Sequence, residues 1–81
     1  MNITLKFFGQ LRELTGTDTL EIKVKKSASV EDLVWVVGER FPIIREHLKH
    51  VSISIDNEYA SKDEILQEGN VIGLLPPISG G

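Results

Sequence analysis

The sequence predicts an α+β fold in which a mixed sheet of about five strands packs on one main helix. The first observation is that apolar and polar residues alternate along several short segments, as they do in strands with one buried face. The second is a single longer segment whose apolar residues recur at helical spacing. A chain of 81 residues, 41% of them hydrophobic, is expected to form one domain around one modest core.

Residues 1–24 predict a wide hairpin. Apolar residues alternate with polar ones in both of its strands; they are Ile3, Leu5 and Phe7 in the first strand and Leu20, Ile22 and Val24 in the second. Gly9 ends the first strand, and residues 9–16 are expected to form a loop before a turn at Gly16.

The segment that begins at Ser29 predicts the main helix. Asp32 lies three residues further on, so the two residues can form a capping box that satisfies the first free backbone N–H groups. The apolar stripe of this helix consists of Val30, Leu33, Val34, Val37 and Phe41. Pro42 ends the helix because proline disfavours a helical residue before it. Trp35 lies off the stripe and is expected to pack under residues 43–48 rather than to bind a partner.

The second half of the chain predicts mainly strands. A short turn of helix over residues 43–50 precedes a strand over residues 51–56. Asp56-Asn57 then turns the chain into a short strand around Tyr59. Residues 62–66 are expected to form a single helical turn.

The last strand is predicted over residues 71–75, and Pro76-Pro77 prevents its continuation. This strand is expected to run parallel beside the first one, at the centre of the sheet. One helix covering one face of such a sheet is the β-grasp, or ubiquitin-like, architecture. We therefore expect residues 1–77 to form a β-grasp domain and residues 78–81 to form a flexible C-terminal Gly-Gly tail.

Composition excludes several classes of function. The chain has no cysteine, so it can form no disulfide, thiolate metal site or cysteine nucleophile. The net charge of -3 argues against a nucleic-acid-binding protein. The sequence has no apolar stretch of membrane-spanning length and no signal-peptide pattern at its start, so we expect a cytoplasmic location.

The usual catalytic groups are scarce. His47 and His50 are the only histidines, and their spacing can place two imidazoles on one helical face for a metal ion. We interpret them instead as two solvated side chains on a short surface segment. The chain has no Gly-rich phosphate loop, and no serine has a convincing base partner. We therefore expect no catalytic residues of an ordinary enzyme, no bound metal and no bound cofactor.

Phe8 and Leu75 are predicted to lie close together on the open face of the sheet. Each follows an inward-pointing residue of its strand, so each points to the opposite face. Tyr59, on the short neighbouring strand, can join them. An exposed apolar cluster usually marks an interaction site. The alternative is that Phe8 folds under the loop over residues 9–16.

The last residues, Gly80-Gly81, have no side chains. Pro76-Pro77 is expected to stiffen the base of the tail and hold it off the domain. Such a tail can thread a narrow channel and deliver a terminal carboxylate to another protein's active site. Conversion to an acyl-adenylate with ATP would make that carboxylate reactive toward a sulfur or amine nucleophile. The sequence therefore predicts a carrier whose working group is the carboxylate of Gly81.

Two segments carry a resemblance to a known family. They are Lys6-Phe7-Phe8-Gly9-Gln10-Leu11-Arg12-Glu13-Leu14-Thr15-Gly16 and Leu75-Pro76-Pro77-Ile78-Ser79-Gly80-Gly81. Through these segments and their spacing, the whole chain resembles the small subunits of molybdopterin synthase, a family of ubiquitin-like sulfur carriers. At Leu75 this family often has an aromatic residue; leucine keeps the apolar character.

The resemblance implies a pathway for sulfur. An adenylyltransferase related to ubiquitin-activating enzymes would use ATP to adenylate Gly81, and sulfur transfer would give a C-terminal thiocarboxylate. The tail, with Gly80, would enter the large synthase subunit, in a heterotetramer, and donate sulfur to a cyclic pterin precursor. The residues expected to contact partners are Phe8, Arg12, Tyr59, Leu75, Pro76, Pro77 and Ile78. Arg12 and Glu13 match the loop motif of the family.

Three alternatives remain open. The chain could be a sulfur carrier for another product, such as thiazole, cysteine or modified transfer RNA. It could be a ubiquitin-like modifier whose tail joins substrate lysines, because only the nucleophile that attacks the adenylate differs. It could also be a structural β-grasp interaction module with an incidental tail. The motif from Phe7 to Gly16 and Pro76-Pro77 favour molybdopterin synthesis over the first alternative.

Overall fold

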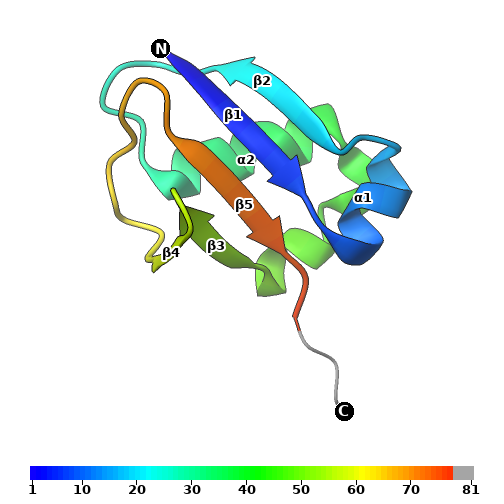
Figure 1. Ribbon diagram of the computed structural model, residues 1–81. Coiled ribbons are helices and arrows are strands. Elements are labelled where there is room, and N and C mark those ends of the chain that lie inside the picture. Colours follow the sequence, from blue (N-terminus) through cyan, green and yellow to red (C-terminus); the bar gives the residue numbers. More distant parts are fainter. Residues whose placement is uncertain (78–81) are drawn as a thin grey trace.

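The computed structural model describes residues 1–77, which form a five-stranded sheet with α2 across one of its faces (Figure 1). In chain order the elements are β1 (Asn2–Phe7), α1 (Gly9–Thr15), β2 (Thr19–Lys23), α2 (Val30–Arg40), the 3₁₀ turns η1 (Pro42–Ile44) and η2 (His47–His50), β3 (Ser52–Ile55), β4 (Glu58–Ala60) and β5 (Val71–Leu75). Within this described part, no helix is long and apolar enough to cross a membrane.

The strand order is β2-β1-β5-β3-β4, with β1 and β5 side by side at the centre of the sheet. These two strands are parallel, as the sequence predicted, and all other neighbouring strands are antiparallel. In the central pair Phe7 lies beside Leu74. The predicted α+β, β-grasp architecture is therefore confirmed.

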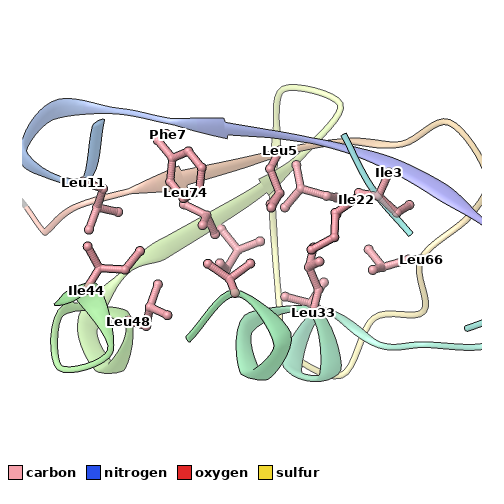
Figure 2. Close-up of a cluster of buried hydrophobic side chains, with 14 residues drawn as sticks. Ile3, Leu5, Phe7, Leu11, Ile22, Leu33, Ile44, Leu48, Leu66 and Leu74 are labelled. Atoms are coloured by element: carbon pink, nitrogen blue, oxygen red, sulfur yellow. The ribbon is translucent and has the colours of Figure 1, made fainter. Parts of the chain in front are cut away.

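The core lies between the sheet and the helices (Figure 2). The central strands bury five alternating residues: Ile3, Leu5, Phe7, Ile72 and Leu74. From the helical side, Leu33 of α2 and Ile44 and Leu48 of the 3₁₀ turns fill the space opposite them. The alternation in β1 and β5 thus assigned the inner and outer faces correctly.

The predicted capping box starts α2. Ser29 Oγ accepts the Asp32 backbone N–H at 3.1 Å, and Asp32 Oδ2 accepts the Ser29 backbone N–H at 2.9 Å. The bond from the Ser29 backbone, helped by the one from its hydroxyl, lowers the pKa of the Asp32 carboxyl. These bonds fix the first turn of the helix over the core.

Three local expectations are wrong. Residues 9–16 are not a loop: α1 occupies Gly9–Thr15 and buries Leu11. Gly16 caps the end of this helix in the left-handed conformation, with a φ of 67°. Residues 62–66 form a turn and an extended bridge, not a helical turn. Their backbone is bonded to the start of α2, where Glu64 O accepts the Val30 N–H at 2.9 Å.

The third wrong expectation concerns Trp35. Its side chain is 70% exposed rather than packed under residues 43–48. The space beneath those residues is already filled by Ile44 and Leu48, which are buried. The indole therefore remains on the outer surface of α2.

Candidate docking surface

Phe8 lies between β1 and α1 and keeps the extended backbone of the strand, with φ -122° and ψ 156°. Because the strand alternation continues through it, its side chain points away from the buried Phe7 to the open face of the sheet. The ring is 41% exposed. Phe8 therefore does not fold under residues 9–16, which form α1 instead.

Gly73 lies beneath this ring, in the middle of β5. A Cβ atom at Gly73 would lie 3.3 Å from Phe8 Cε2 and 3.8 Å from Leu75 Cδ1. It would also lie only 2.5 Å from Ser54 Oγ, closer than a Cβ contact allows. Phe8 and Leu75 are thus brought together, as the sequence predicted, and the absence of a side chain at Gly73 makes room for the ring.

Tyr59 joins the same face through the pairing of the strands. It lies opposite Ser54 of β3, and Ser54 lies opposite Gly73 of β5, so all three share the open face. The Tyr59 side chain is 81% exposed. We define Phe8, Tyr59 and Leu75 as the docking surface, with the buried Gly73 beneath it. The part played by Gly73 and Ser54 was not foreseen, because it depends on the register between β3 and β5.

The chain leaves the docking surface through Pro76 and Pro77. The Pro76 ring is half-buried beside Gly9 at the start of α1: a Cβ atom at Gly9 would lie 3.0 Å from Pro76 Cγ. Gly9 also has a φ of 55°, which glycine adopts at little cost. Pro77 is exposed. The predicted tail residues Ile78, Gly80 and Gly81 lie outside the described residues.

Arg12 and Glu13 lie on α1, so the motif matched to a family loop is helical here. Arg12 Nη1 lies 3.5 Å from Asp18 Oδ1, and both side chains are mostly exposed. An exposed pair of this kind contributes little to stability. The Arg12 guanidinium therefore lies near Asp18 but stays mostly exposed to solvent.

The two histidines lie on η2. His47 is half-buried, and its Nδ1 atom is buried with no hydrogen-bond partner among residues 1–77. Over the same part of the chain, no group of three or more histidine or acidic side chains is arranged to hold a metal ion. Three of the predicted site residues, Phe8, Tyr59 and Leu75, thus gather on the open side of the sheet.

Comparison with known proteins agrees with the resemblance to ubiquitin-like sulfur carriers. The model of the ThiS family matches residues 5–81. The molybdopterin synthase sulfur carrier subunit of Drosophila erecta is 32% identical over 85 aligned positions, which cover 100% of this chain and 92% of that protein.

Two solved structures are similar over nearly their full length. A putative molybdopterin converting factor, subunit 1, from Pyrococcus furiosus is 30% identical with a TM-score of 0.87, covering 95% of this chain and 98% of that one. The small archaeal modifier protein SAMP1 from Haloferax volcanii is 25% identical with a TM-score of 0.90, and the match covers 100% of both chains. Fold and sequence match agree, and the chain belongs to the ThiS family of ubiquitin-like β-grasp proteins.

Proposed function

We propose that this chain is the sulfur carrier subunit of a molybdopterin synthase and that the carboxylate of Gly81 carries the sulfur. The observation that carries the proposal is the family match, which runs from β1 through Gly80-Gly81 and so includes both the docking surface and the last two residues. The relative from Drosophila erecta, which bears this function in its name, supports it.

The chemistry requires an activated carboxylate. A partner adenylyltransferase would join the Gly81 carboxylate to AMP from ATP, releasing pyrophosphate. A sulfur nucleophile then displaces AMP and leaves a thiocarboxylate. Within the large synthase subunit this group gives its sulfur to the pterin precursor, and water supplies the oxygen that restores the carboxylate. ATP belongs to the activating enzyme, and this chain contributes the acyl group and delivers it.

The geometry favours delivery to a partner that holds the docking surface. Leu75 belongs to that surface, and the chain continues from it directly into Pro76 and Pro77. Gly81 follows Leu75 by six residues, so a fully extended segment reaches about 20 Å from the surface. A partner bound over Phe8 and Leu75 therefore needs its active site within that distance. We propose this arrangement for both the large subunit and the activating enzyme.

Mass spectrometry tests the proposal. The purified protein is incubated with activating enzyme, ATP and a sulfur source, and its intact mass is measured before and after. We expect the exchange of one oxygen for sulfur, confined to the peptide with residues 63–81 that trypsin releases after Lys62. A variant lacking Gly81 should show no exchange while still binding both partners. Sulfur found elsewhere, or exchange in the truncated variant, would rule the proposal out.

A second candidate function is conjugation to lysines of other proteins. The similarity to SAMP1, a modifier protein, favours it. The same adenylate would form, and a lysine amine would displace AMP to give an isopeptide bond. In the same reaction mixture, species of higher mass that survive reduction would reveal this activity. A thiocarboxylate alone would assign the chain to sulfur transfer.

A further inference from the structure

One edge of the sheet is open for pairing. β2 is outermost and has β1 as its only neighbour in the described sheet. The Val24 N–H donates to Met1 O and the Phe7 N–H donates to Asp18 O, each at 2.9 Å. Since backbone groups alternate in direction along a strand, Thr19, Glu21 and Lys23 direct theirs away from the sheet.

A groove of about 380 Å³ lies where this edge ends, between Lys23 at the end of β2 and α2. Its lining is Lys23, Val24, Lys25, Ala28, Asp32 and Val36. Its apolar members are Val24, Ala28 and Val36, and Val36 is 37% exposed. The groove therefore offers apolar contact next to a row of unpaired backbone groups.

The rim of the groove is basic although the molecule is acidic, with a net charge of -3. Lys23, Lys25 and Lys26 lie close together in the chain, and none of them forms an ion pair within residues 1–77. Asp32, the acidic residue of the lining, keeps its negative charge, so the lining itself carries two lysines, Lys23 and Lys25, against one carboxylate. Charge complementarity therefore favours an acidic occupant. A second copy of this chain would instead bring another basic rim to the same place.

We propose that this groove binds an extended acidic segment of a partner protein, which adds to β2 as a further strand. Backbone bonds to Thr19, Glu21 and Lys23 would hold the segment. Its alternate aliphatic side chains would fill the groove over Val24 and Val36, and flanking carboxylates would meet the lysines. The docking surface lies on the open face, mainly on β5 and β4, so the two sites can be occupied together. The proposal does not depend on sulfur transfer.

The test uses a labelled synthetic peptide in which alternating valine and isoleucine residues are flanked by glutamates. Nuclear magnetic resonance of the full-length protein follows both chemical shifts and amide exchange during the titration. We expect saturable binding, with slowed exchange at the Glu21 and Lys23 amides. The Leu20 and Ile22 amides, which face β1, should change little. This alternation separates strand addition from simple attraction of charges.

Three variants sharpen the test. Val36→Glu places a carboxylate in the groove, and Lys25→Glu reverses a charge on its rim; each should weaken peptide binding by about tenfold or more. Lys62→Glu makes the same charge change outside the groove and should leave the affinity unchanged. Binding that Lys62→Glu weakens equally, exchange that slows without alternation, or no saturable binding would overturn the proposal. So would sedimentation showing that the groove pairs two copies of the chain.

Discussion

At the scale of single residues, the docking surface depends on one glycine. Gly73 leaves room for both the Phe8 ring and the Ser54 hydroxyl above β5. A Cβ atom at Gly73 would lie 2.5 Å from Ser54 Oγ and 3.3 Å from the Phe8 ring. Sequence alternation placed Phe8 and Leu75 on the open face, but it could not show that Ser54 lies close to Gly73. That proximity requires the pairing of β3 with β5, and residues far apart in the chain set this pairing.

Phe8→Ala should weaken partner binding more than folding. Aromatic anchors at the centre of an interface can each contribute about 2 kcal/mol or more to binding. Calorimetric titration against the large subunit and the activating enzyme measures the loss. Trp35→Ala is the matched control, since it removes another exposed aromatic ring from the outer surface of α2. Equal affinities for Phe8→Ala and wild type would show that these partners do not bind the docking surface.

Gly73→Val should weaken the same interactions without removing any contact residue. The new side chain must displace Ser54 and the Phe8 ring, so the shape of the docking surface changes. Calorimetry with the large subunit should show reduced affinity, while circular dichroism checks that the fold persists. A folded variant with wild-type affinity would show that the Phe8 ring need not lie over Gly73.

At the scale of elements, strands were easier to predict than short helical pieces. The strands show clear alternation, and α2 has a capping box and a full apolar stripe. By contrast α1 has seven residues, starts at a glycine, has no side-chain cap and buries only Leu11. Residues 62–66 carry no signal for the backbone bonds that tie them to the start of α2. Tertiary contacts decide these two segments.

Two neighbours on β5 should respond oppositely to truncation. Leu74 is fully buried, so Leu74→Ala should lower the free energy of unfolding by ~2–5 kcal/mol through lost burial and the cavity left behind. Leu75→Ala removes a half-buried side chain of the docking surface and should cost less stability but more partner affinity. Denaturant titration and calorimetry of both variants test this. The reverse order of effects would mean that the faces of β5 are exchanged.

The capping box predicts a specific pH dependence of stability. Its hydrogen bonds lower the pKa of Asp32 in the folded protein. The stabilisation is therefore complete above the pKa of an unfolded aspartate, about 3.9, and is lost as the pH falls through the lower folded value. Asp32→Asn should be less stable than wild type at neutral pH, and the difference should shrink in acid.

Denaturant titrations over a series of pH values measure this difference. Glu31→Gln is the control, because Glu31 shares the first turn of α2 but makes no capping bond. A difference between wild type and Asp32→Asn that stays constant from neutral to acid pH would contradict the capping account.

At the scale of the whole molecule, the fold places the docking surface next to Pro76, where the chain leaves the sheet. The parallel pair β1 and β5 brings Phe8 beside Leu75, and β5 then leads into Pro76, which rests against Gly9. The fold class and the two central strands could be predicted because their buried residues alternate. The exposure of Trp35 could not be predicted, since it depends on Ile44 and Leu48 filling the space beneath η1 and η2.

The carrier role of Gly81 is tested most directly by synthase activity with a chain lengthened by one alanine after Gly81. In a reconstituted system with activating enzyme, ATP, sulfur source and large subunit, wild type should yield the sulfur-containing pterin. The lengthened chain should yield none, because the Gly81 carbonyl is then a peptide bond and cannot be adenylated. It should bind the large subunit through an unchanged docking surface. Product formed at the wild-type rate by the lengthened chain, with its extra residue still present by mass, would contradict the account.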